Sequence, residues 1–110
     1  MPIIEIRRYL TPSGEDVFGA WLAKLEPRGR AKVIARLDRL ALGNFGDCKF
    51  LRHGVFELRI GWGPGYRVYY GRVGSAVVLL LCGGDKRKQS SDIERAMEYL
   101  EEFGKRAGRS

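Results

Sequence analysis

The sequence predicts an α+β domain in which helices pack on a mostly antiparallel four-stranded sheet. Two observations support this class: the spacing of apolar residues changes from a helical period to strict alternation and back, and glycine-rich turns separate the alternating segments. The expected order is strand, helix, helix, three strands in a meander, and a final helix. We expect a single domain over residues 1–104 and a flexible tail over residues 105–110.

The N-terminal part contains the first strand and two helices. Ile4 and Ile6 alternate with charged residues, which predicts a short strand. Ser13 and Asp16 have the spacing of a capping box and predict the start of the first helix. A second helix follows, and Gly43 suits its C-terminal end. The residues of this second helix expected to face inward are Val33, Ile34, Leu37, Leu40 and Ala41, and its outer face is basic, as in Arg36.

The C-terminal part contains three expected strands and the last helix. Around residues 56–62 the apolar residues alternate, so Glu57 and Arg59 are placed on the face opposite the core. Residues 77–81 are all apolar, which indicates a strand buried on both faces. A capping box at Ser91 begins the helix, and Gly104 ends it. One continuous core is predicted from Phe18, Trp21, Leu25, Leu37, Leu58, Val78, Leu80, Met97 and Leu100.

Charge and composition favour some classes of protein over others. The 110-residue chain has a net charge of +7, and residues 44–88 hold eight basic and three acidic groups, a net +5. Fourteen of the twenty basic residues are arginine, which suits phosphate binding. No apolar run approaches the ~18 residues of a membrane span. We therefore expect a cytoplasmic protein with a polyanionic partner, no membrane association, and free thiols at Cys48 and Cys82.

The sequence argues against several kinds of enzyme. His53 is the only histidine and the two cysteines lack metal-type spacing, so we expect no metal and no cofactor. No phosphate-binding loop of the Gly-x-x-x-x-Gly-Lys-Ser/Thr type is present. The glycines at 61, 63 and 65 lie between two expected strands and are interpreted as a hairpin turn.

A set of cations provides the positive signal for function. Arg59 and Arg67 lie on neighbouring expected strands, tyrosines flank Arg67, and the loop 86–88 is wholly cationic. Such a surface binds single-stranded nucleic acid through phosphate contacts and base stacking. The alternative is a solvated sheet face whose arginines pair with Glu57. If the surface cleaves RNA without metal, Glu57 and His53 are the candidate bases and the cations stabilise the phosphate.

The segment Leu81–Ala96 resembles a known family. Its pattern Gly-Gly-Asp-Lys-x-x-Gln-x-x-Asp-Ile-x-x-Ala is similar to the HigB-like, phage-derived addiction module killer branch of the RelE/ParE toxin superfamily. Phe56–Ile60 resembles the Tyr/Phe-Glu-Leu-Arg strand of that branch, and Tyr66–Tyr70 resembles its Tyr-Arg-x-x-Tyr strand. Leu51–Gly54 resembles the segment that enters the first of these strands.

This resemblance implies a four-stranded sheet with two N-terminal helices, and the toxin of a type II toxin–antitoxin system. The implied activity is metal-independent, ribosome-dependent cleavage of mRNA, which inhibits translation. The implied partners are mRNA, the ribosome and a cognate antitoxin of helix-turn-helix type, with DNA contacted only through the antitoxin. Alternatives are a ParE-like poison of DNA gyrase, or a non-catalytic module that binds nucleic acid or antitoxin.

Candidate site residues follow by position from the resemblance and from the cationic pattern. The candidate catalytic residues are Arg67, Arg59, Lys86, Arg87 and Glu57, and the candidate RNA-binding residues are Arg52, His53, Tyr69, Lys88 and Gln89. Glu57 stands where RelE has a basic residue, and the C-terminal tyrosine of RelE has no match in this chain. These differences leave the general acid and base open.

Overall fold

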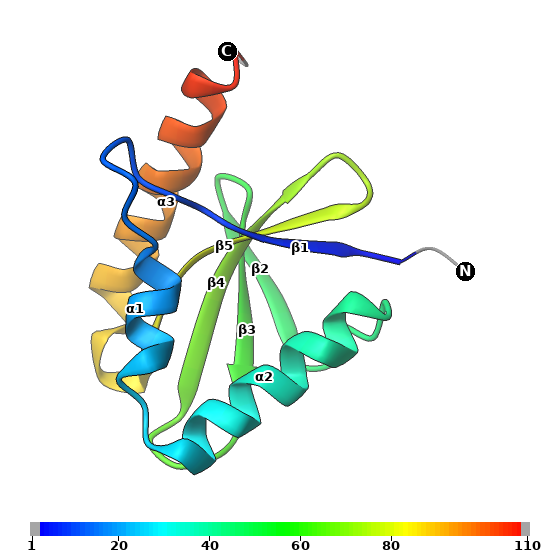
Figure 1. Cartoon of the computed structure of the whole chain (residues 1–110), viewed down its shortest axis with the longest axis vertical. Coiled ribbons are helices and arrows are strands. Elements are labelled where there is room, and N and C mark those ends of the chain that lie inside the picture. The colour runs from blue at the N-terminus through cyan, green and yellow to red at the C-terminus, as the bar shows by residue number, and fades with distance from the viewer. Residues whose placement is uncertain (1–2, 109–110) are drawn as a thin grey trace.

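A computed structural model describes residues 3–108 as an α+β fold with a five-stranded sheet and three helices (Figure 1). The elements are β1 (Glu5–Arg8), α1 (Val17–Ala23), α2 (Pro27–Ala41), β2 (Cys48–Arg52), β3 (Val55–Ile60), β4 (Tyr66–Val73), β5 (Val77–Asp85), the short 3₁₀ turn η1 (Lys86–Lys88) and α3 (Gln89–Arg106). The strand order is β1-β5-β4-β3-β2, with β1 parallel to β5 and the other neighbours antiparallel.

The α+β class is confirmed, whereas the expected count of four strands is wrong. The additional strand is β2, which pairs with β3 through Cys48 opposite Leu58 and Phe50 opposite Phe56. Lys49, Phe50 and Arg52 in this strand are exposed, so it carries no clear alternation of buried apolar residues. An edge strand of this kind forms because a neighbour offers backbone hydrogen bonds, which local sequence does not reveal.

Helix ends differ from the expected ones by a few residues. Asp16 itself is the N-cap of α1, since its side chain accepts from the Gly19 N–H at 2.9 Å, whereas the Ser13 hydroxyl contacts Thr11. At the end of α2, Gly43 follows the C-cap with a φ of 90°, as expected. Ile34, predicted to be buried, is 43% exposed.

Helix α3 is longer at both ends than the sequence predicted. Asp85 caps η1 by accepting from the Arg87 N–H, and α3 then begins at Gln89 rather than near Ser91. The helix continues past Gly104 to Arg106, whose guanidinium donates to the Leu10 carbonyl. Two residues of the expected tail therefore belong to the helix, and residues 109–110 lie outside the described part of the chain.

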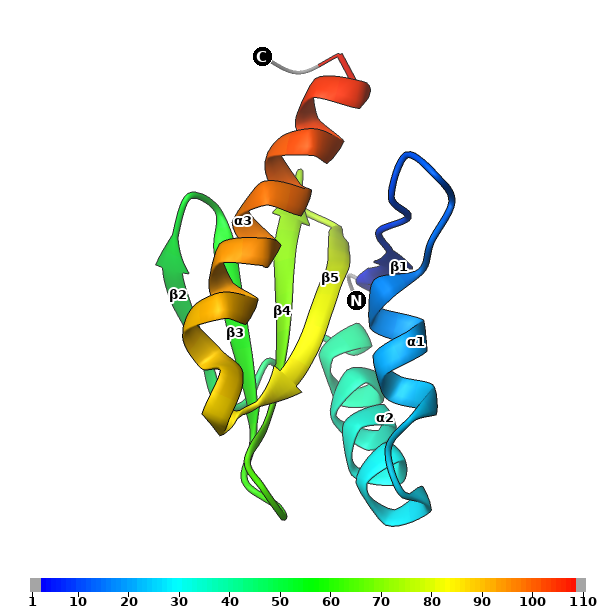
Figure 2. The same cartoon turned by 90° about the vertical axis from the view of Figure 1, so that its left-hand side faces the viewer.

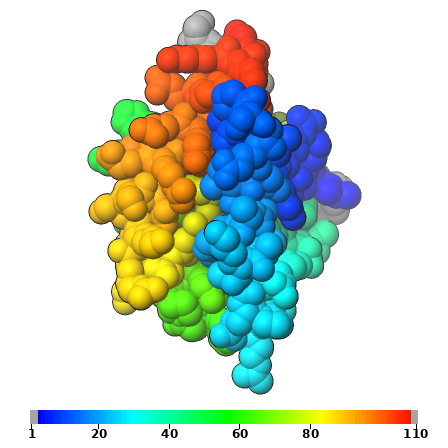
Figure 3. Space-filling model, turned by 60° about the vertical axis from the view of Figure 1, so that its left-hand side comes forward, coloured from blue at the N-terminus to red at the C-terminus, as the bar shows by residue number. Residues whose placement is uncertain are grey.

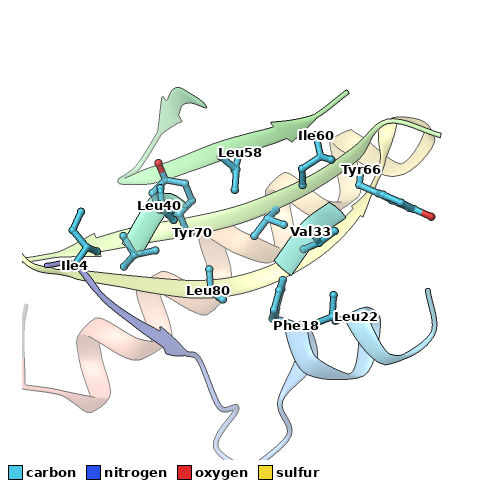
Figure 4. Close-up of a cluster of buried hydrophobic side chains, with 12 residues drawn as sticks. Ile4, Phe18, Leu22, Val33, Leu40, Leu58, Ile60, Tyr66, Tyr70 and Leu80 are labelled. Carbon is cyan, nitrogen blue, oxygen red and sulfur yellow. The ribbon is translucent and has the colours of Figure 1, made fainter. Parts of the chain in front are cut away.

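The sheet has a hydrophobic core on each face. Figure 2 shows α3 on one face of the sheet and α1 and α2 on the other. The core under α1 and α2 includes Phe18, Leu58 and Leu80 (Figure 4), while Met97 and Leu100 of α3 pack in the second core. The expected single continuous core is therefore wrong, because the sheet separates the two groups. The prediction that Val78 and Leu80 are buried is confirmed.

Helices cover both faces of the sheet, so a site on either face lies next to a helix.

Within residues 3–108, no helix combines the length and the apolar character that crossing a membrane requires.

Candidate functional site

The carboxylate of Glu57 links three elements at one end of the sheet. Glu57 lies on β3 and is only 1% exposed. Arg67 of β4 donates from Nη1 to Glu57 Oε1 at 3.1 Å, and Gln89 at the start of α3 donates from Nε2 to Oε2 at 2.7 Å. Each carboxylate oxygen therefore has its own donor, which is how proteins accommodate a buried charge.

Two arginines lie side by side next to this carboxylate. Arg59 and Arg67 are opposite each other in the β3–β4 register. Two like charges so close repel each other unless acids lie between or beside them. Arg59 Nε lies 3.3 Å from Asp47 Oδ1 and 3.8 Å from Glu57 Oε1. The Arg67 side chain is 13% exposed and that of Arg59 is 40% exposed, so Arg67 is held while Arg59 reaches the solvent.

The cationic turn η1 joins this pair of arginines at the same end of the sheet. Asp85, the last residue of β5, is opposite Tyr66 on β4, next to Arg67. Arg87 pairs with Asp85 at 3.1 Å, and this guanidinium lowers the pKa of the Asp85 carboxyl. Lys86 and Lys88 are exposed and have no ion pair within residues 3–108. We call Arg59, Arg67 and Lys86–Lys88 the cationic end.

Arg52 and His53 lie at the end of β3 remote from Arg59, although Arg52 also lines a pocket with Ser90 and Ser91 at the start of α3. Arg52 ends β2 opposite Val55, so it is at the end of β3 remote from Arg59. His53 occupies the β2–β3 turn with a φ of +52°.

Of the ten predicted site residues, direct contacts join Glu57 to Gln89, Arg67 and Arg59. Lys86–Lys88 follow at the end of β5, where Arg87 and Lys88 line a separate pocket beside α1. Arg52 and His53 are at the other end of β3, and Tyr69 is buried.

Tyr69 is not a stacking surface. Its side chain is 0% exposed, and its hydroxyl has no hydrogen-bond partner within residues 3–108. Burial, together with the nearby Glu57 carboxylate, raises the pKa of the Tyr69 hydroxyl. Tyr66 and Tyr70 are also buried. The predicted surface of arginines interleaved with tyrosines is therefore wrong in its aromatic part, since a buried ring has no free face for a base.

Sequence reasoning missed two residues beside the site. Lys49 of β2 is exposed and lies opposite Glu57 in the register, and Asp47 precedes the same strand. No local signal identifies them, because their position depends on β2 joining the sheet.

The geometry also limits the chemistry of Glu57. Both of its oxygens accept hydrogen bonds and the residue is buried, so it is poorly placed to take a proton from an external hydroxyl. It accepts hydrogen bonds from both Arg67 and Gln89 and so restrains these two side chains. In the described residues 3–108, no three His, Cys, Asp or Glu side chains are grouped in a way that suits a metal ion.

The fold and the cationic end define a small α+β protein with five basic residues at one end of its sheet, of which the arginines pair with Asp47, Glu57 and Asp85. Residues 20–101 match the model of the family described as phage-derived protein Gp49-like, so the chain belongs to that family, which is associated with RelE/HigB-like toxins. The chain is also 47% identical over 102 residues to an uncharacterized protein of Haemophilus influenzae, covering 92% of this chain and 97% of that protein. Membership in the family suggests a toxin-like function.

Proposed function

We propose that this protein is the toxin of a type II toxin–antitoxin system and cleaves mRNA on the ribosome without a metal ion. Family membership supports the toxin class. The observation that carries the chemistry is the cationic end, in which the buried carboxylate of Glu57 holds Arg67 at 3.1 Å. This arrangement suits a phosphate that gains negative charge during the reaction.

The reaction uses the ribose 2′-hydroxyl as the nucleophile. Its oxygen loses its proton to a solvent water and forms a bond to the adjacent phosphorus while the bond to the 5′-oxygen breaks, leaving a 2′,3′-cyclic phosphate and a protonated 5′-hydroxyl. Arg67 stabilises the phosphate at low reorganisation cost because Glu57 fixes it in place. Arg59 and the exposed lysines of η1 bind neighbouring phosphates, and a lysine ammonium supplies the proton for the leaving oxygen. Glu57 acts through Arg67 as a positioning residue.

The remaining partners follow from the same proposal. A cognate antitoxin of helix-turn-helix type neutralises the toxin, and the toxin meets DNA only through it. The place of action is the cytoplasm, where the ribosome presents the mRNA.

The test compares two double variants, each of which lacks two exposed basic side chains. Lys86→Ala with Lys88→Ala removes two exposed cations from the cationic end, and Lys32→Ala with Arg39→Ala removes two exposed cations from α2. Each protein is expressed without antitoxin, and mRNA ends are mapped by primer extension in cells and in cell-free translation with and without ribosomes. We expect new ribosome-dependent ends from the parent and the α2 variant, and roughly 10-fold less cleavage from the η1 variant.

Two results would contradict the proposal. If the parent arrests growth while mRNA stays intact and DNA replication stops, the target is DNA gyrase. If the η1 and α2 variants cleave equally well, the cationic end is not the site.

A further inference from the structure

A groove lies between α3 and the β2–β3 turn, away from the cationic end. Its volume is about 610 Å³ and it is lined by His53, Glu94, Met97, Glu98, Leu100 and Glu101. Met97 and Leu100 are half-buried, whereas the three glutamates and His53 are exposed. In Figure 2 the middle of α3 passes beside the turn that joins β2 and β3. We call this feature the α3 groove: an apolar floor with an acidic rim.

The charge of the α3 groove is unusual for this chain. The protein carries +7 overall, but Glu94, Glu98 and Glu101 form one line along α3 at spacings of four and three residues. Like charges at these spacings destabilise a helix. Within residues 3–108, Glu94 and Glu98 have no ion pair, and Glu101 has only Lys105 at 3.7 Å. Among the described residues only this one ion pair offsets the repulsion, although Arg52 lines a neighbouring pocket with Glu94, and a cationic partner would relieve it.

The shape of the α3 groove indicates one type of partner. Glu94 to Glu101 spans about 10 Å, two helical turns. A complementary surface has an apolar stripe for Met97 and Leu100 and a line of Lys or Arg for the glutamates, which is the pattern of a basic amphipathic helix. RNA is unsuited because its phosphates would meet three carboxylates. A second copy is unsuited because Val33 and Leu40 of its basic helix α2 are fully buried and the exposed Ile34 alone does not form an apolar stripe.

We propose that the α3 groove binds a basic amphipathic helix of the antitoxin. The preference of the groove for a basic amphipathic helix follows from its geometry and charge, whereas the identity of the partner as the antitoxin rests on the proposed function. The neutralising protein then contacts an acidic surface of a basic toxin, in addition to any contact with the cationic end.

A labelled peptide tests the groove independently of toxicity. The probe is a fluorescent helical peptide of about 15 residues with a leucine stripe and Lys or Arg elsewhere, and the control peptide replaces each Lys or Arg by Glu. The groove variant is E94K/E98K/E101K. The matched control variant is E5K/E15K/E26K, which makes the same change in charge at exposed glutamates elsewhere. Binding is measured by fluorescence anisotropy, and circular dichroism checks folding.

We expect the basic peptide to bind the parent and the control variant alike, and the groove variant about 10-fold more weakly or worse. Equal weakening in both variants would mean that attraction is spread over the whole surface, and would overturn the proposal. Equal binding of the acidic peptide, or no binding of the basic one, would also overturn it.

A second experiment tests the partner. The protein encoded next to the toxin is co-expressed with each variant, and growth is followed. E94K/E98K/E101K should arrest growth as the parent does but no longer be rescued. Full rescue of this variant would overturn the antitoxin assignment. If the parent itself causes no growth arrest, the proposed function fails. The peptide experiment then still decides whether the groove binds a basic helix.

Discussion

At the scale of single residues, Glu57 and Arg67 form a pair in which each depends on the other. Glu57 is buried with donors on both oxygens, and Arg67 is mostly shielded from water. Removing one member of such a pair leaves a buried charge without its partner, whereas removing both charges is much better tolerated. Arg67, the cation proposed to bind phosphate, therefore also contributes to the stability of the fold.

Arg67→Ala is expected to lower the free energy of unfolding by about 3 kcal/mol, because Glu57 keeps only Gln89 as a close donor. Urea unfolding followed by circular dichroism measures the change. Combining Arg67→Ala with Glu57→Gln should recover a large part of the loss, because the buried charge is gone. Both variants should fail to arrest growth, since both lack the cation. An unfolding midpoint of Arg67→Ala equal to that of the parent would show that the pair contributes nothing to stability.

Asp92 provides a pH-dependent prediction. Asp92 is 3% exposed and its carboxyl lies against Gly84, so burial raises its pKa above the ordinary value of 3.8 although Arg95 opposes the shift. The folded protein therefore binds this proton more tightly than the unfolded chain does, and stability falls as pH rises through the raised pKa. Asp92→Asn should be more stable than the parent at pH 7, and the difference should vanish as pH falls to about 3.8. Thermal unfolding across this range checks the sign, and a variant less stable at pH 7 would refute it.

At the scale of elements, helices α1 and α3 meet at the end of strand β5. Figure 3 shows the face of the molecule where α1 and α3 lie next to each other. A Cβ atom on Gly83 would lie 2.3 Å from the Trp21 ring of α1, and one on Gly84 would lie 1.9 Å from the Asp92 carboxylate of α3. The two glycines therefore let both helices approach the strand, and through α3 they set where Gln89 reaches Glu57.

Gly83→Ala is expected to destabilise the fold by about 1–3 kcal/mol, because the rigid Trp21 ring must move. Gly61→Ala is the matched control, since a Cβ atom there meets nothing within 4 Å. Chemical unfolding of the two variants measures the difference. Equal stability of both variants would mean that α1 shifts freely on the sheet.

At the scale of the whole molecule, charge is divided between two surfaces. The cationic end contains Arg59, Arg67 and η1, whereas the α3 groove presents three glutamates further along α3. A net charge of +7 therefore understates the local difference between these surfaces. Such a division lets one small protein attract a polyanion at one end and a cationic segment at another.

If the proposed function holds, binding of the protein to ribosomes programmed with mRNA should weaken steeply as salt rises from about 50 to about 200 mM, because phosphate contacts release counterions. The variant that lacks Lys86 and Lys88 should show a shallower dependence on salt. The variant that lacks Lys32 and Arg39 should keep the slope of the parent. Co-sedimentation with ribosomes measures both slopes, and identical slopes for all three proteins would place the phosphate contacts elsewhere.

The sequence alone determined the class of the fold, the buried strand β5, the helical stripes and the cationic character of residues 44–88. These properties are local: they follow from residue spacing and composition over ten or so positions. The short exposed strand β2 was missed because its residues lack alternation and join the sheet only through a neighbour. Helix boundaries near Ser91 and Gly104 were placed too far inward because caps depend on the folded backbone.

The tertiary structure decided where the candidate residues lie and which of them are shielded from water. Glu57 is a buried anchor because α3 covers its face of the sheet and supplies Gln89, a residue 32 positions away. Tyr69 is buried for the same reason, and strand register places Arg52 at the end of β3 remote from Arg59. The position of β1 beside β5 and the two separate cores are likewise long-range contacts. Residue type and spacing specify which groups are present, but only packing between distant segments determines which are shielded from water and which meet.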